Sequence, residues 1–229
     1  MNKNKYILLL LLPVFILPSC DKVKETSVYK SYQTSPTPGK SVETDSSPAR
    51  SGDFAQALND YNAKNYEKSV KGFQEVVKSD PENQQAHFYL GKSFQNLKKD
   101  DNAIAAFKEA VKLTPKSAEA NFELGNIYYN RKEYETAMPF YEEALKIDNY
   151  STKMMMALGE TYRMQGMHQY SIVQYNKILN YEPENAMAHY NIGITYIHLK
   201  NKIAARQTQQ TLEKIDKKLA KKLSDLIGE

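Results

Sequence analysis

The chain has 229 residues, with nine glycines, no tryptophan and apolar residues at helical spacing from about residue 51 onward, so little room is left for a β-sheet. We therefore expect an all-α protein. The formal charge is +4 and both signs are interspersed along the predicted helices, which argues against a nucleic-acid-binding surface. The single cysteine, Cys20, excludes an intramolecular disulfide.

Residues 1–20 have the layout of a secretory leader: a short basic segment, an apolar run from Tyr6 to Leu17 and a region of small residues. Twelve helical residues reach about 18 Å, against a hydrocarbon core of about 30 Å, so a permanent transmembrane helix is disfavoured. Removal of the leader with Lys3 and Lys5 leaves a charge of about +2.

The end of this leader reads Leu17, Pro18, Ser19, Cys20, which resembles the lipobox of bacterial lipoproteins. The resemblance implies cleavage before Cys20, a diacylglyceryl group on its thiol and an acylated amino terminus (palmitate or a similar chain). Two or three acyl chains anchor a protein stably to a membrane. The alternative is an ordinary secretory peptide followed by a free thiol.

Residues 20–50 contain many Ser, Thr, Lys and Pro residues and almost no apolar periodicity, which predicts a disordered linker after the lipidated cysteine. About 30 flexible residues have a root-mean-square reach of roughly 30 Å, enough to hold a folded domain away from lipid headgroups. A cleavable spacer is equally consistent with this composition. We expect a signal peptide over residues 1–19, this linker over 20–50 and a folded domain over 51–229.

From Ala86 to Pro115 the chain carries a pattern that recurs with a fixed period of about 34 residues. Each unit has a glycine preceded by Leu or Ile and followed three residues later by an aromatic residue, the glycines being Gly91, Gly125, Gly159 and Gly193. Self-similarity at a fixed period indicates a solenoid, in which each unit buries its apolar face against its neighbours.

With Gln84 as position 1, the second unit has small residues at positions 20 and 27, an aromatic residue at 24 and a proline at 32, namely Ala103, Ala110, Phe107 and Pro115. This pattern resembles the tetratricopeptide repeat (TPR), a helix-turn-helix unit of about 34 residues. The resemblance implies a right-handed superhelix of about five repeats plus a C-terminal capping helix that runs to residue 229. The repeats are expected at about 50–83, 84–117, 118–151, 152–185 and 186–219.

Several units depart from the pattern. In the first repeat, Tyr61 and Tyr66 are five residues apart, which suggests a turn that is one residue shorter than in later repeats. Asp100 and Asp101 precede an apolar run and are expected to cap a helix rather than bind a metal.

The motif fades in the fifth repeat, where Gln209 replaces the aromatic residue. Beyond it, apolar residues at helical spacing predict the amphipathic capping helix, with Leu219, Leu223, Leu226 and Ile227 on its buried side. The alternative is a basic helix at a membrane surface, but five lysines against four acids from Leu212 onward predict little net attraction.

Enzyme and metal motifs are missing: there is no Gly-rich phosphate loop, no HExxH and no Cys pair with metal spacing. His87 and His189 share one repeat position and are expected to pack between helices. His168 is expected in a turn, and His198 is the one histidine expected to face the groove. We therefore expect no catalytic activity, no cofactor and no metal.

In TPR arrays the first helices of the repeats line a concave groove, with positions 2, 5, 9 and 12 facing it. Position 5 carries apolar residues in four successive repeats here, an arrangement suited to binding a peptide segment; the alternative is that these residues are generic repeat filling. The lysine, asparagine and arginine clamp for a terminal carboxylate, known from chaperone-binding TPR proteins, is therefore not expected. The candidate groove residues are Phe88, Lys92, Phe122, Asn126, Tyr129, Met156, Glu160, Arg163, Tyr190 and Ile194.

The sequence thus predicts a lipid-anchored cell-envelope adaptor or scaffold on the periplasmic or extracellular side, whose groove binds a segment of a partner protein. TPR lipoproteins of similar layout serve as pilotins, in outer-membrane protein assembly and as adaptors of peptidoglycan enzymes. Two alternatives are an accessory or cryptic envelope enzyme and a self-assembling scaffold.

Overall fold

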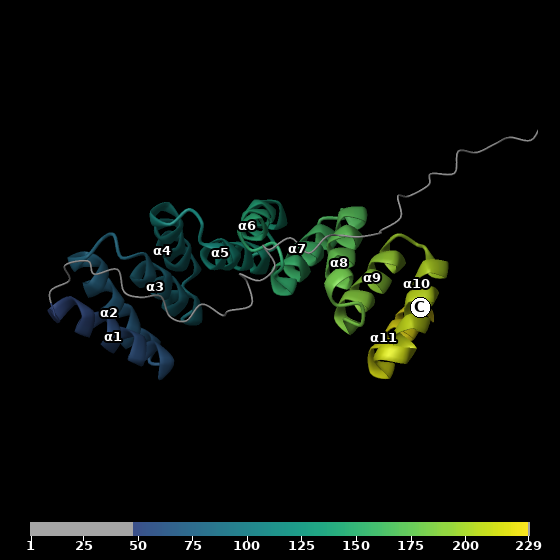
Figure 1. Ribbon diagram of the computed structural model, residues 1–229, viewed down its shortest axis with the longest axis horizontal. Helices are drawn as coiled ribbons and strands as arrows, with labels where there is room; N and C mark the ends of the chain where they lie inside the picture. The colour runs from purple at the N-terminus through teal and green to yellow at the C-terminus, as the bar shows by residue number, and fades with distance from the viewer. Residues whose placement is uncertain (1–47, 229) are drawn as a thin grey trace, which may run out of the picture. The chain divides into compact units, whose positions relative to one another are not determined.

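The computed structural model describes residues 48–228, and within this range every regular element is an α-helix. The helices follow one another in chain order from one end of the array to the other (Figure 1). Residues 46–229 form one compact unit. Within the described part of the chain its buried apolar residues extend from Ala57 to Ile227, and we expect this unit to fold without the preceding segment. The predicted leader, Cys20 and most of the predicted linker lie outside the described residues.

Eleven helices are present between residues 48 and 228, and they alternate between two sets. The odd-numbered first helices of the pairs are α1 (Pro48–Asn62), α3 (Gln84–Asn96), α5 (Ala118–Asn130), α7 (Thr152–Met164) and α9 (Ala186–His198). The even-numbered second helices are α2 (Tyr66–Ser79), α4 (Asp100–Leu113), α6 (Tyr134–Ile147), α8 (His168–Tyr181) and α10 (Lys202–Ile215). The last helix is α11 (Lys217–Gly228).

Helix α1 begins at Pro48, ahead of the expected domain start at residue 51. Proline is favoured in the first turn of a helix, because the N–H that it lacks would have no intrahelical partner there. Composition alone placed this proline in the linker. A fragment intended to fold therefore has to begin before Pro48.

Two local features mark the helix ends: a side-chain N-cap at the start of four of the first helices, and a residue with positive φ in the turn of all five pairs. A side-chain oxygen accepts a hydrogen bond from the backbone three residues later at the start of each of α3, α5, α7 and α9, from Asn83, Ser117, Ser151 and Asn185. Such N-caps contribute about 1 kcal/mol each. The turn inside each pair contains a residue with positive φ, at Lys64, Lys98, Lys132, Gly166 and Lys200.

The turn of the first repeat was expected to be one residue short, but it has the same length as the later turns. Lys64 precedes Lys98 by one full repeat length, and α2 begins the same distance before α4, so the first turn has the common length. Tyr61 packs edge-on against Tyr66 with ring centroids 5.7 Å apart, and Tyr129 packs on Tyr134 at 5.3 Å. The two pairs are equivalent, so the spacing of five is a regular feature and not a deletion.

Asp100 and Asp101 do not cap α4 as expected. The N-cap residue is Lys99, and both aspartates lie inside the first helical turn without a capping hydrogen bond. They pair instead with Arg131 of the next repeat, at 3.6 Å and 2.8 Å respectively. Acidic residues in a first turn still interact favourably with the helix dipole.

The repeated glycines are the points where paired helices approach each other most closely. A Cβ added at Gly91 would lie 2.8 Å from the Phe107 ring, and one at Gly125 would lie 2.6 Å from the Tyr141 ring. Gly159 stands in the same relation to Tyr175, at 2.7 Å. The glycine and the aromatic residue of each repeat therefore form one packing unit.

Gly193 has a different partner, because Gln209 occupies the aromatic position of its repeat. Leu223 of α11 contacts the site where a Cβ of Gly193 would lie. Ala220, Leu223 and Ile227 of α11 are buried against the last repeat, as the capping prediction requires. Leu226, which the sequence placed with them, is instead 37% exposed.

The odd-numbered helices lie on the inner side of the array. Contacts join α1 to α3, α5 to α7, α7 to α9 and α9 to α11, whereas no two even-numbered helices make comparable contacts between residues 48 and 228. An array whose first helices touch one another curves toward them. Among these helices, none is long and apolar enough to cross a membrane.

Candidate partner-binding groove

The candidate groove is the surface formed by side chains of α3, α5, α7 and α9, and the ten residues predicted for it all belong to these four helices. We call this surface the inner face. Its character changes along the array: polar side chains bonded to one another dominate on α3 and α5, and apolar side chains dominate on α9.

The polar part of the inner face is organised around Glu123, a nearly buried residue of α5. Its Oε1 accepts from Lys92 Nζ at 2.8 Å. Its Oε2 accepts from Gln95 Nε2 and from Asn126 Nδ2, both at 3.1 Å. The hydroxyl of Tyr141 donates to Asn126 Oδ1 at 2.9 Å, so the network continues into the core.

Burial and bonding have opposite effects on the pKa of Glu123. Burial alone would raise the pKa, because it disfavours the charged form. The hydrogen bond and charge of Lys92, together with the amides of Asn126 and Gln95, outweigh burial, and the pKa lies below its usual range. Glu123 is therefore a carboxylate whose acceptors are occupied, which makes it a structural group rather than a free site.

A second charged pair lies on α7. Arg163 Nη2 donates to Glu160 Oε1 at 3.3 Å, and the Arg163 side chain is only 14% exposed. Burial, and then the nearby charge and hydrogen bonding of Glu160, raise the pKa of the Tyr129 hydroxyl well above its usual value. Lys92 and Asn126 were expected to be available to a peptide, but their side chains already bond within the protein. Arg163 bonds Glu160 through Nη2, while its buried Nε has no partner among the described residues.

The apolar part of the inner face lies mainly on α9. Met187 is 49% exposed, while Tyr190 and Ile194 are half-buried and pack partly against the core that includes α11. Met156 of α7 is half-buried, and its sulfur accepts a hydrogen bond from Asn191 Nδ2 at 3.2 Å. Met187 is the exposed large apolar side chain of this region.

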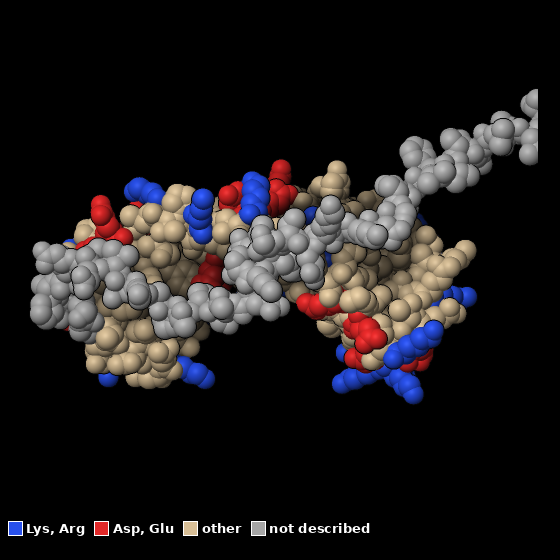
Figure 2. All heavy atoms as spheres, viewed as in Figure 1, with Lys and Arg blue, Asp and Glu red and all other residues tan. Residues whose placement is uncertain are grey.

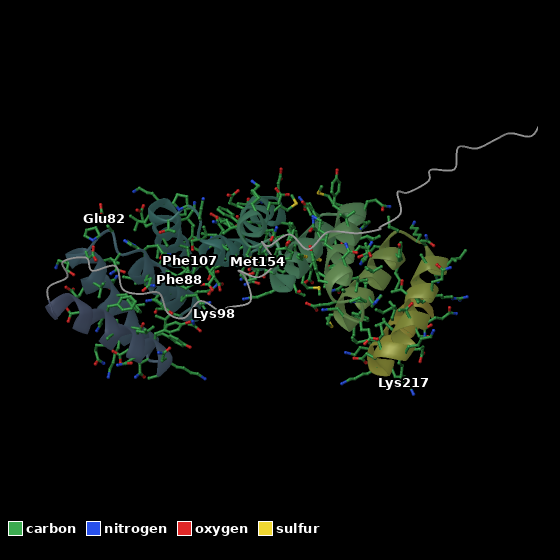
Figure 3. All side chains as sticks on the ribbon, viewed as in Figure 1. Glu82, Phe88, Lys98, Phe107, Met154 and Lys217 are labelled. Atoms are coloured by element: carbon green, nitrogen blue, oxygen red, sulfur yellow. The ribbon has the colours of Figure 1, made fainter. Side chains whose placement is uncertain are left out.

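Phe122 was expected to be exposed in the groove, but it is buried. It is only 5% exposed, packs on Tyr141 with ring centroids 5.5 Å apart, and is covered by Lys153, whose Nζ lies 4.4 Å from the ring centroid. Phe88 is half-buried against Phe107, with centroids 5.6 Å apart (Figure 3). Aromatic residues at position 5 therefore pack first against their own repeat.

The histidines divide into two kinds. His87 and His189, at the same repeat position, each place Nε2 against a carbonyl oxygen six residues earlier, on Pro81 at 3.0 Å and on Pro183 at 2.9 Å. They join a helix to its preceding loop. His168 is the first residue of α8 and not a turn residue, and its ring stacks on the exposed His198 with centroids 5.5 Å apart.

Sequence reasoning did not select Glu123 or the pair of His168 and His198. A signal for Glu123 existed: Lys92 and Glu123 have opposite charges and are 31 residues apart, slightly less than one repeat. Such a spacing joins inner positions of adjacent repeats. No comparable signal joins the two histidines, because one belongs to a second helix and the other to a first helix.

Among the described residues, no group of three or more His, Cys, Asp or Glu side chains could hold a metal ion. A hollow of about 290 Å³ lies at the start of α3 and is lined in part by Gln85, Phe88 and Glu119. A shallow depression of about 490 Å³ is bounded only by the loop residues 182–185.

Comparison with known proteins identifies the repeats. A family model described as tetratricopeptide repeat matches residues 54–117 and 101–152. No curated protein sequence matches the chain. The presence of TPR units is thus confirmed within residues 54–152.

Solved structures extend the likeness in fold over a larger part of the chain. A crystal structure of MamA is 24% identical, covers 72% of this chain and 96% of its own, and superposes with a TM-score of 0.67. YrrB, described as a TPR protein with an unusual peptide-binding site, is 18% identical, with coverage of 76% and 90% and a TM-score of 0.68. MamA 41-end from Desulfovibrio magneticus RS-1 is 16% identical, with coverage of 74% and 94% and a TM-score of 0.67. The predicted all-α TPR superhelix is confirmed.

Proposed function

We propose that this protein is a non-catalytic adaptor of the cell envelope that binds a segment of a partner protein along the inner face. The TPR fold itself supports a role in protein binding. The observation that carries the proposal is the exposed side chain of Met187 on α9, the helix that also carries the half-buried Tyr190 and Ile194.

The chemistry of the inner face favours a segment with apolar side chains. Lys92, Glu123 and Asn126 are bonded to one another, so a partner gains little from charged groups placed on α3 and α5. Burying methionine and isoleucine surface on α7 and α9 contributes about 25 cal/mol per Å². Flexible methionine side chains also adapt to different apolar partners.

The envelope location rests on the amino-terminal sequence. Residues 1–20 combine a basic start, an apolar run and a lipobox-like end at Cys20. An acylated Cys20 would hold the repeats near a membrane, and residues 21–47 would act as a tether. The partner would then be another envelope component, in a pathway such as pilus assembly, outer-membrane protein assembly or peptidoglycan remodelling.

The anchor is tested by Cys20→Ser in the full chain. We expect loss of the protein from the membrane fraction, or an uncleaved precursor of larger mass. Mass spectrometry of the mature amino terminus reads the acyl groups directly. An unchanged membrane fraction together with an unmodified amino terminus would refute the anchor.

The groove is tested with immobilised residues 46–229 and an envelope extract. Met187→Asp places a charge on the inner face and should abolish capture of the specific partner. Val173→Asp on α8 is the matched control, because Val173 is 52% exposed and Met187 is 49% exposed. Equal loss of capture with both variants, or loss only with Val173→Asp, would contradict the proposal.

A further inference from the structure

The excess of positive over negative charge lies at the C-terminal end of the array. Residues 48–201 contain 18 Lys and Arg residues against 19 Asp and Glu residues. Residues 202–228 contain seven against three. The last two helices therefore carry the excess positive charge, and basic side chains gather over them in Figure 2.

Helix α11 separates its apolar and basic residues onto opposite sides. Ala220, Leu223 and Ile227 are buried against the last repeat. The opposite side of the helix is exposed and carries four lysines, Lys217, Lys218, Lys221 and Lys222 (Lys217 is labelled in Figure 3). We call this side the outer face of α11. It also carries Asp225.

The two acids that precede α11 in the chain, Asp216 and Glu213, accept hydrogen bonds from groups other than the outer-face ammonium groups. Asp216 accepts from the backbone N–H groups of Lys218 at 2.9 Å and Leu219 at 3.0 Å, so its carboxylate faces the start of α11. Glu213 accepts from Gln209 at 2.7 Å on α10. Within residues 48–228, none of the four outer-face lysines forms an ion pair.

The side-chain types favour one class of phosphate-bearing partner. A lysine ammonium binds phosphate as a point charge, whereas specific nucleic-acid recognition relies on arginine forks and aromatic stacking. Helices α10 and α11 contain no aromatic residue and one arginine, Arg206. Leu226, 37% exposed and one helical turn from Lys222, adds an aliphatic group at the edge of the face. A cluster of lysines close to a membrane is attracted to the anionic lipids of its surface.

We propose that the outer face of α11 binds the surface of an anionic phospholipid bilayer. This contact is separate from the inner face and does not require acylation of Cys20. It would orient the last repeat toward the membrane while the inner face stays available to a partner.

The test uses residues 46–229, which lack the leader and Cys20, and flotation with vesicles. One set contains phosphatidylcholine with about a third phosphatidylglycerol, and the other contains phosphatidylcholine alone. We expect binding only to the anionic vesicles, and loss of binding at high salt. Each lysine near such a surface contributes about fivefold in partitioning, so Lys218→Glu with Lys221→Glu and Lys222→Glu should reduce it at least 100-fold.

A control with the same change in net charge separates this face from general electrostatics. Lys68→Glu with Lys71→Glu and Lys78→Glu alters three exposed lysines of α2, at the other end of the array, and should change partitioning less than about fivefold. If the α11 variant fails to fold by circular dichroism, Lys218→Gln with Lys221→Gln and Lys222→Gln replaces it, with an expected loss of at least 20-fold.

Three results would overturn the proposal: no binding of the unaltered protein to anionic vesicles, equal loss with the α2 and α11 variants, or tighter binding to duplex DNA or RNA than to vesicles in the same buffer. Met187→Asp should leave vesicle binding unchanged. Failure of this proposal is therefore distinguishable from failure of the groove proposal.

Discussion

Glu123 shows how single residues join adjacent repeats. Its carboxylate accepts bonds from Lys92 and Gln95 of one helix and from Asn126 of its own helix. Removing one member of a buried charged pair leaves the other uncompensated, and this loss exceeds the value of the pair itself. The network therefore joins α3 to α5 in a way that loss of a single member would disrupt.

We predict that Glu123→Ala lowers the free energy of unfolding by about 2 to 3 kcal/mol, because it strands Lys92. Denaturant titration measures the loss. Glu184→Ala, at an exposed loop position, should stay within about 0.5 kcal/mol of the unaltered protein. If Glu123→Ala is no more destabilising than this control, the hydrogen-bond network does not stabilise the contact between α3 and α5.

The same carboxylate predicts a dependence on pH. Its pKa is lower in the folded than in the unfolded protein, so its contribution is fully present above about pH 4.3 and is lost as pH falls through the folded value. In Glu123→Gln this part of the acid dependence should disappear. Parallel stability curves between pH 5 and pH 3 would contradict the assignment.

Phe122 gives the opposite prediction from the one that its repeat position suggested. Because it is 5% exposed and packed on Tyr141, Phe122→Ala should destabilise the fold by about 3 to 5 kcal/mol. Met187→Ala, at an exposed position, should cost less than about 0.5 kcal/mol. Thermal melts of both variants test this; similar melting temperatures would show that Phe122 is a surface residue.

The repeat positions did not predict which of the candidate groove residues remain accessible. The repeat period places Phe122 and Tyr190 on equivalent sites. Their exposure differs because neighbours decide it: Lys153 covers Phe122, whereas Tyr190 lies beside α11. Contacts of this kind join residues about one repeat apart, and they depend on side-chain identity in both repeats.

At the scale of helices, the glycine and aromatic positions fix the distance within each pair. Gly125→Ala places a Cβ 2.6 Å from the Tyr141 ring, closer than real contacts allow. We expect a loss of about 1 to 3 kcal/mol, or roughly 2 to 4 °C in melting temperature for each kcal/mol. Gly228→Ala is the control, since a Cβ there meets nothing within 4 Å. Equal melting temperatures would show that this glycine is not the point of closest approach.

The helices were predictable from the sequence because period and packing agree. Glycines and aromatic residues that recur with one common period and apolar faces at helical spacing all describe the same pairs. The substitution of Leu223 for a missing aromatic contact was not predictable, because Gly193 and Leu223 belong to different pairs. The capping helix was expected. That its Leu223 contacts Gly193 in place of the repeat's missing aromatic residue is seen only in the packing.

At the scale of the whole array, stability is nearly a sum of repeat and neighbour terms, so local changes act locally. The inner face and the outer face of α11 can therefore be altered separately. Lysines with positive φ, such as Lys98 at 59°, lie just after the first helix of a pair. There the favourable interaction of a cation with the helix end offsets part of the backbone strain. The presence of lysine at these turn positions is therefore explained without a binding partner.

The central claim is that a partner lies along the inner face, and site-specific photo-crosslinking tests it most directly. A photoreactive amino acid replaces Met187 on the inner face, and in a second protein it replaces Val173 on α8, two positions of nearly equal exposure. We predict that the photoreactive residue in place of Met187 yields a discrete crosslinked product with one envelope protein and that the one in place of Val173 yields none. A discrete product from Val173 alone would contradict it and place the partner on the outer side.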